Sequence, residues 1–196
     1  MPAYLLPRLI LITLGVLLLL AVWHDVRRRR IPNYLVFPGA LLALLLQSLL
    51  PSGAGLFLTP FGGIGLLPAL GGLGAGLAML LPLYALGAMG AGDVKLMAMV
   101  GAFVGWPGIA VVAVTTLLAG GVLGAAVALF NGQLGKLLMN SMHLLTHSAL
   151  KSLAGESARI EPPAAPSGKL PYAIAIAAGA APYLLYAALT GKSLLT

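Results

Sequence analysis

Apolar segments of bilayer-spanning length are the feature that most limits how this chain can fold. A transmembrane helix needs roughly 20 mainly apolar residues. Six segments approach or reach that length: residues 3–23, 34–50, 64–84, 87–105, 109–130 and 171–189. Hydrophobic residues make up 60% of the 196 residues and charged residues only 8%, too few to coat a soluble domain of this size. The sequence therefore predicts an all-α, polytopic membrane protein with six transmembrane helices.

We expect one membrane-embedded domain over residues 1–196. The longest polar stretch, residues 132–170, is short and is interrupted by leucines, so it predicts a connection between spans rather than a soluble domain. Residues 1–25 have the length of a secretory signal peptide, but they lack a clear basic start and a small-residue cleavage site. The segment is therefore expected to remain as the first transmembrane helix.

Positive charges are distributed unevenly between the two sides of the predicted bundle. Six spans place both termini on one side, and Lys and Arg gather on the cytoplasmic side of membrane proteins. With the termini outside, Arg8 and Lys192 are the outer cations. The inner connections then hold Arg27, Arg28, Arg29, Arg30, Lys95, Lys136, Lys151, Arg159 and Lys169. This orientation and anionic lipid explain the net charge of +7, and no basic domain with interleaved aromatics predicts nucleic-acid binding.

The polar connection contains apolar residues at helical spacing. They recur on one face of residues 134–153, and the other face carries Lys136, Asn140, His143, His147 and Lys151. The pattern predicts an amphipathic helix on the inner membrane surface. His143 and His147 have the i, i+4 spacing of metal ligands, but no third ligand is near them and the chain has no cysteine. No metal site is therefore predicted.

Two of the four acidic residues, Asp25 and Asp93, lie at or within apolar segments. A carboxylate in a membrane helix costs roughly 2.5–3.5 kcal/mol, so it usually serves a function and faces protein or water. In the predicted topology Asp25 reaches the inner edge and Asp93 lies about 9 Å in from it. The alternative is a structural ion pair, of Asp25 with the arginines or of Asp93 with Lys95. Lys95 is two residues from Asp93, so the two side chains diverge on a regular helix.

Both aspartates lie in segments that resemble a known family. "GAGDVKLMAMVGAFVGW", residues 90–106, resembles the GxGD motif of the type IV prepilin peptidases, and "DVRRRRIPN", residues 25–33, is similar to their first-aspartate motif. The resemblance implies an aspartic endopeptidase that cuts the short basic leader from pilin-like precursors at the cytoplasmic face. It assigns Asp25 and Asp93 as the catalytic pair and Gly90 and Gly92 as the motif glycines.

The residues themselves fit this chemistry without a cofactor. Amide hydrolysis by two carboxylates needs one ionised group to accept a proton from water and one protonated group to polarise the carbonyl. Carboxylates placed close together in a low dielectric do not both ionise easily, so they share a proton. Glycines before Asp93 let backbones approach closely or loosen the helix beside the carboxylate.

The resemblance also indicates which branch of the family this chain is similar to. Larger members methylate the new amino terminus and carry a cytoplasmic insertion with paired cysteines. Here the first inner connection is short and there is no cysteine, so methyltransferase activity is not expected. The compact form looks like the Tad/Flp-pilus prepilin peptidases, and an archaeal preflagellin peptidase would look similar. A bacterial inner membrane, with outer termini and a cytoplasmic active site, is the expected location.

Several polar residues have more than one interpretation. Four consecutive arginines are expected to fix the orientation in the membrane and to bind lipid headgroups: Arg27, Arg28, Arg29 and Arg30. They could also attract an acidic group on the precursor. Lys95 is expected to pair with a lipid phosphate or to bias the charge of Asp93. Pro32 and Asn33 are expected to end the first connection and to start the second helix, or to shape the site.

Aromatic residues and His24 are given interfacial roles. Trp23, Tyr34, Trp106 and Tyr172 fall at predicted span ends, where aromatic belts form. His24 adjoins Asp25 in the sequence, but neighbouring side chains on a helix diverge, so an interfacial histidine is expected.

Two other functions are compatible with the residues alone. A small ion-coupled transporter or channel would use the two aspartates to bind or relay a cation, and the glycines would line a broken helix. A structural membrane subunit would tolerate replacement of either aspartate, but it does not explain their similar depth. The sequence leaves the oligomeric state and the identity of the precursor open.

Overall fold

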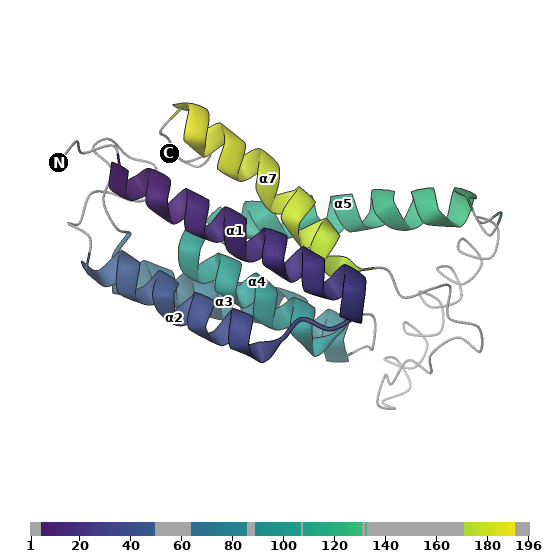
Figure 1. The fold of residues 1–196 in the computed structure, drawn as a ribbon, viewed down its shortest axis with the longest axis horizontal. Helices are drawn as coiled ribbons and strands as arrows, with labels where there is room; N and C mark the ends of the chain where they lie inside the picture. Colours follow the sequence, from purple (N-terminus) through teal and green to yellow (C-terminus); the bar gives the residue numbers. More distant parts are fainter. Residues whose placement is uncertain are drawn as a thin grey trace, which may run out of the picture.

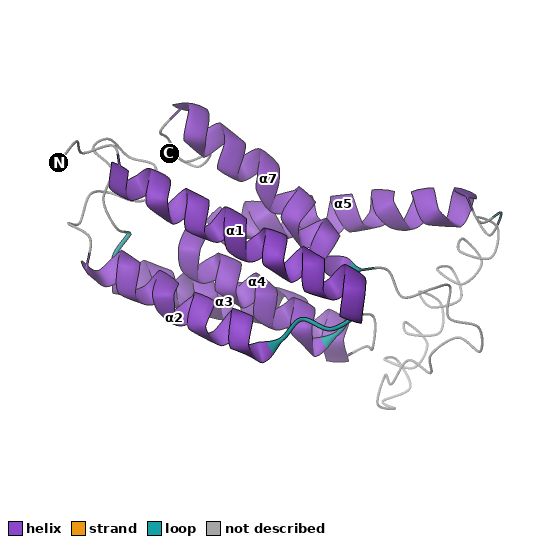
Figure 2. Cartoon of the chain, in the orientation of Figure 1, coloured by secondary structure: helices purple, strands orange, loops and turns teal. Residues whose placement is uncertain are grey.

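The structure is a computed structural model, and it describes residues 5–49, 64–85, 89–106, 108–130, 132 and 171–190. Every regular element within these residues is an α-helix (Figures 1 and 2). This confirms the all-α class, whereas the predicted amphipathic helix over residues 134–153 lies outside the described residues. In chain order the helices are α1 (Leu5–Arg28), α2 (Asn33–Leu49), α3 (Leu66–Ala85), α4 (Ala91–Val104), α5 (Gly108–Phe130) and α7 (Tyr172–Thr190).

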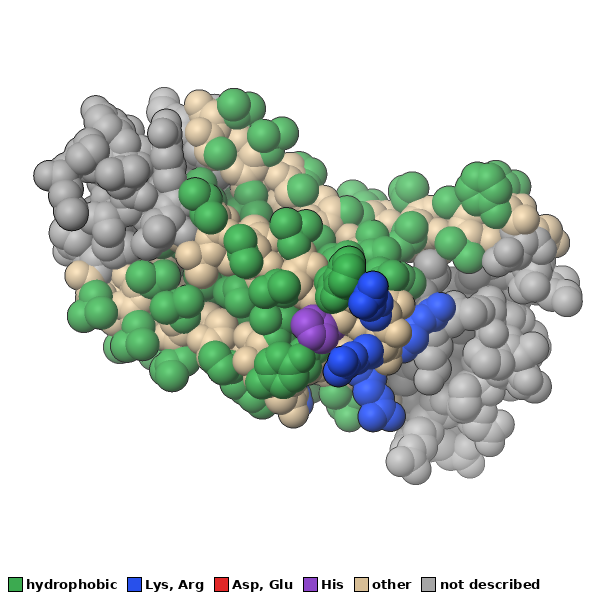
Figure 3. Space-filling model, in the orientation of Figure 1, with side chains coloured by type: hydrophobic (Ala, Val, Ile, Leu, Met, Phe, Trp, Pro, Cys, Tyr) green, Lys and Arg blue, Asp and Glu red, His purple; other side chains and the backbone are tan. Residues whose placement is uncertain are grey.

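Three of these helices, α1, α3 and α5, are long and apolar enough to cross a membrane, and α2 and α7 are apolar but shorter. Large apolar side chains project outward from the long helices: Leu19 is 70% exposed, Leu67 82% and Phe130 89%. The face drawn in Figure 3 is accordingly mostly apolar. A surface of this kind is typical of a protein surrounded by lipid, and the six-span count stays a prediction.

Two helices differ in extent from the predicted spans. α1 continues past residue 23 to Arg28, so Asp25 is part of the helix. α4 begins at Ala91 rather than at residue 87, and Gly90 precedes it with an extended backbone, φ −83° and ψ 152°. Glycine is a poor helix former, which accounts for the later start. Asp93 therefore lies in the first turn of α4 and not about 9 Å along it.

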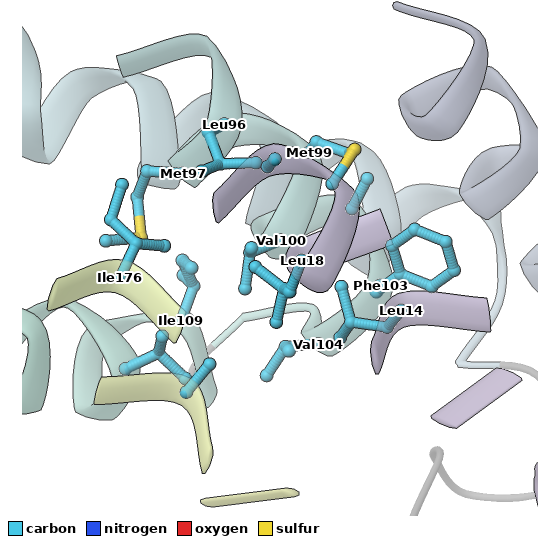
Figure 4. Packing of buried hydrophobic residues seen from close by; sticks show 14 of the residues in the cluster. Leu14, Leu18, Leu96, Met97, Met99, Val100, Phe103, Val104, Ile109 and Ile176 are labelled. Carbon is cyan, nitrogen blue, oxygen red and sulfur yellow. The ribbon is translucent and has the colours of Figure 1, made fainter. Parts of the chain in front are cut away.

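Helix α4 occupies the middle of the bundle and contacts each of the other described helices (Figure 1). Every residue from Leu96 to Val104 is buried. Apolar side chains from α1 and α7 pack against it. Figure 4 shows Leu14 beside Phe103, Leu18 beside Val100, and Met97 pointing toward Ile176. Since protein surrounds α4, a helix of 14 residues can lie inside the bundle without spanning the lipid itself.

Helices α3 and α4 touch through their backbones because glycines face each other. Gly72 and Gly76 are four residues apart on α3, and Gly101 and Gly105 are four apart at the end of α4. A Cβ at Gly72 would collide with the carbonyl oxygen of Gly101, and a Cβ at Gly101 with that of Gly72. A Cβ at Gly76 would lie 2.6 Å from the Met97 oxygen. Small residues at this spacing are a common way for membrane helices to pack closely.

Polar side chains join the helices at two further places. The Gln47 side chain of α2 is 1% exposed; its Nε2 donates to the Phe103 oxygen at 2.8 Å, and its Oε1 accepts from the Ile64 N–H at 3.0 Å. Thr115 of α5 donates to the Gly179 oxygen of α7 at 2.7 Å. These bonds fix the end of α4 against α2, and α7 against α5.

Candidate active site

Asp25 continues the buried stripe of α1. This carboxylate is 7% exposed, and its Oδ2 accepts a hydrogen bond from the backbone N–H of Ala173 at 3.1 Å. Ala173 is in the first turn of α7, where amide groups have no partner within the helix and favour a negative charge. The stripe therefore directs Asp25 into the bundle, and α7 supplies its hydrogen-bond donor. The preceding buried residues on this face of α1 are Ile10, Leu14, Leu18 and Ala21.

Asp93 is held by the first turn of its own helix. It is 9% exposed, and its Oδ2 accepts a hydrogen bond from the backbone N–H of Gly90 at 3.0 Å. A Cβ at Gly90 would lie 3.2 Å from that same oxygen, closer than such contacts usually are, so glycine leaves room for the carboxylate to fold back. The α4 N-terminus also favours negative charge at this position.

Two buried carboxylates come from separate parts of the chain, on helices that pack against each other. Asp25 is on α1, Asp93 is on α4, and α1 contacts α4. Carboxylates that lie close together in a low dielectric favour sharing one proton. Such a pair contains one group able to accept a proton from water and one able to donate a proton to a carbonyl oxygen. These are the two proton transfers that amide hydrolysis requires.

A tight connection between α1 and α2 closes over the start of α4. Arg29 ends α1 with a left-handed backbone, φ 53°, and its N–H bonds the Asp25 carbonyl at 2.8 Å. The chain then places Ile31 against α4, since a Cβ at Gly92 would lie 3.2 Å from the Ile31 Cβ. The carbonyl of Pro32 accepts the first hydrogen bonds of α2. Gly92 thus lets this connection pack one residue away from Asp93.

The model of the type IV leader peptidase family matches residues 12–129 of the chain, a range that contains Asp25 and Asp93 and most of the described helices. The chain belongs to this family. No curated protein and no solved structure matches it significantly.

Membership of the leader peptidase family confirms the resemblance found in the two aspartate motifs. It supports a leader peptidase-like protease and gives no support to the ion-coupled transporter. Helix α7, which donates to Asp25, lies beyond the matched residues. The family match therefore accounts for the two aspartates but not for the element that closes the site around them.

In this leader peptidase family member Lys95 ties α4 to α2. Its Nζ donates to Oδ1 of Asn33 at 3.1 Å and lies 5.3 Å from the centre of the Phe37 ring. The ammonium group therefore points away from Asp93, as the two-residue spacing predicted. Asn33 is the first residue of α2, so the bond fastens the beginning of that helix to the first turns of α4.

The arginines surround the end of α1 on the same side as the aspartates. Arg27 to Arg30 are exposed, and the guanidinium of Arg27 lies 4.2 Å from the centre of the Trp23 ring. Figure 3 shows the Lys and Arg side chains gathered in one place, where α1 ends. The neighbouring His24 bonds the Tyr34 hydroxyl at 2.9 Å and the Leu20 oxygen at 2.9 Å. His24 therefore belongs to the surface network and points away from the buried pair.

The sequence does not mark the start of α7 as part of the site. It predicts Tyr172 in an aromatic belt, yet this side chain is partly buried and packs against the core. The Ala173 amide bonds Asp25. Pro171 indicates that a helix begins there, and helix N-termini favour carboxylates. Nothing in the sequence, however, pairs this helix end with Asp25, 148 positions earlier.

Proposed function

We propose that this protein is a membrane-embedded aspartic endopeptidase that removes the short basic leader of type IV prepilin-like precursors, with Asp25 and Asp93 as its catalytic pair. The observation that supports the proposal is the burial of these two carboxylates on contacting helices in a chain of the leader peptidase family. Membrane helices retain buried acidic groups mainly for function.

In the proposed mechanism the ionised aspartate takes a proton from water, and the resulting hydroxide attacks the scissile carbonyl carbon. The protonated aspartate donates its proton to the carbonyl oxygen, which gives a neutral tetrahedral diol. The diol then loses a proton to one carboxylate while the leaving amine gains one, and the C–N bond breaks. The products are a carboxylic acid and an amine, and the pair again holds one proton.

The position of the pair fits a leader sequence next to a membrane helix. Asp25 lies one turn before the end of α1, beside the exposed arginines, and the positive-inside rule assigns this end to the cytoplasm. A substrate with a cytoplasmic leader and a following transmembrane segment would present its junction at that level. The arginines would attract an acidic group on the precursor or anionic lipid.

The Tad/Flp class of precursor is the most consistent with the short first connection of this chain. Residues 29–32 alone connect α1 to α2, and the sequence contains no cysteine. There is thus no counterpart of the cysteine-bearing insertion of the larger enzymes. We propose leader removal without methylation of the new amino terminus.

Co-expression with a Flp-type pilin precursor tests this function. We expect a mobility shift with the unaltered protein, and Asp25→Asn or Asp93→Asn should each lower the cleavage rate by about 100- to 10,000-fold, because one proton transfer is lost. Glu156→Gln and Glu161→Gln are matched controls, since they make the same chemical change outside the predicted spans. Cleavage at the normal rate by either aspartate variant, with normal membrane levels, would exclude the proposal.

A further inference from the structure

The N-terminal turn of α7 reaches the proposed pair, although it is outside the residues that the family model matches. Its Ala173 amide donates to Asp25 at 3.1 Å. Tyr172, the residue before Ala173, is the first residue of the helix. α7 also contacts both α1 and α4, the helices that carry the two aspartates.

The packing of α4 on α7 places Tyr172 opposite Asp93 independently of charge. Met97 of α4 points toward Ile176 of α7 (Figure 4), and both are fully buried. Asp93 is one turn before Met97, and Tyr172 is one turn before Ile176. Residues four apart lie on the same face of a helix. The same two faces that meet at Met97 and Ile176 therefore carry Asp93 and Tyr172 toward each other.

The ring of Tyr172 lies beside α5. A Cβ at Gly120 would lie 3.4 Å from Cε1 of Tyr172 and 3.6 Å from the Ala175 Cβ, which are ordinary contact distances. The ring is therefore a neighbour of α5 at Gly120. Its hydroxyl, the polar tip of a partly buried ring, is the only hydrogen-bonding group that this side chain has.

Tyr172 is less exposed than the tryptophans at other helix ends. Trp23 is 55% exposed and Trp106 is 56% exposed, as expected for side chains at a lipid–water boundary. Tyr172 instead packs against the buried core. An interfacial anchor has no need of such burial or of a carboxylate partner.

We propose that Tyr172 is a positioning residue of the aspartate pair, whose hydroxyl acts on the Asp93 carboxyl and fixes its orientation toward Asp25. The inference rests on the proposed peptidase function. Lys95, on the same helix as Asp93, is turned to Asn33. The face of α7 that packs against α4 at Met97 and Ile176 carries Tyr172, whose phenol is a neutral hydrogen-bond donor.

Tyr172→Phe tests the role of the hydroxyl because it keeps the ring against Gly120. With purified protein and a Flp-type precursor in detergent, we expect kcat to fall about 10- to 100-fold, the usual effect of losing a hydrogen bond to a charged group. KM should stay within about twofold, because substrate binding does not involve the hydroxyl. Thermal unfolding of the variant should match that of the unaltered protein.

Tyr186→Phe is the matched control, with the same change on the same helix 14 residues further along. It should retain normal kcat. A Tyr172→Phe variant with unaltered kcat, or an equal loss in both variants, would overturn the inference while leaving the proposed function intact. Failure of the unaltered protein to cleave, or normal cleavage by Asp93→Asn, would instead overturn the proposed function and this inference with it.

Discussion

Single polar side chains determine how α4 is held at its two ends. At its beginning Lys95 donates to Asn33, and at its end Gln47 bonds the Phe103 carbonyl. Removing the partner of a buried polar group costs more free energy than removing the partner of an exposed one, because water can replace the lost hydrogen bond only at the surface. Gln47 is the more deeply buried of the two and joins two different backbone groups, so its loss should be the more damaging.

Gln47→Leu should lower the free energy of unfolding by about 1–3 kcal/mol. The substitution keeps the side-chain size close to that of glutamine but leaves the Phe103 carbonyl and the Ile64 N–H without their partner. Unfolding in detergent, followed by circular dichroism, measures the change. Ser48→Ala is the control, because Ser48 is exposed and bonds only the Leu45 carbonyl of its own helix. Equal stability of the two variants would contradict the expectation.

At the scale of helices, α3 and α4 depend on the absence of side chains where they cross. The carbonyls of Gly72 and Gly101 occupy the space that a Cβ on the other helix would need. Backbone atoms cannot move aside as a flexible side chain can. Helix α4 carries Asp93, so a change in how α3 and α4 cross would also move this carboxylate.

Gly72→Ala should destabilise the protein by about 1–3 kcal/mol, the usual effect of forcing extra atoms into a packed interior. Gly74→Ala on the same helix is the control: nothing lies within 4 Å of a Cβ there, so alanine should be neutral or stabilise by up to about 1 kcal/mol. Unfolding midpoints in detergent compare the two variants. The α3–α4 contact described above would be wrong if Gly72→Ala were tolerated as well as Gly74→Ala.

Helix positions follow from the sequence more readily than helix contacts do. Hydropathy placed each described helix because lipid requires long apolar segments. Helix α4 starts later than the predicted residue 87 because three glycines near its start weaken helix formation. The Gly72–Gly76 spacing is itself a sequence signal of close helix packing. The hydrogen bond from Ala173 to Asp25 has no such signal, since an apolar helix in lipid has little polar face to show which side turns inward.

At the scale of the whole molecule, charge is concentrated at one end. The arginines at the end of α1 are exposed, and the buried Asp25 lies within a turn or two of them. Figure 3 shows no comparable cluster of Lys and Arg elsewhere on the described part of that face. The positive-inside rule predicts that this end faces the cytoplasm.

Reporter fusions test that orientation. Alkaline phosphatase needs disulfides, which form in the periplasm and not in the cytoplasm. It should be active when fused after Thr196 and inactive when inserted in the polar connection at residue 150. Green fluorescent protein at the same two sites should give the opposite pattern of fluorescence. Reversal of both patterns would place the aspartates on the periplasmic side.

The hydrogen bond between Ala173 and Asp25 has a consequence for how the protein matures. Ribosomes release α1 well before α7, and the donor for Asp25 is 148 residues further along the chain. On the proposed function, a nascent chain that has inserted only α1 to α5 holds both acids but lacks the turn that donates to Asp25. Proteolytic competence would then arise only after α7 has been made, which protects precursors from an unfinished enzyme.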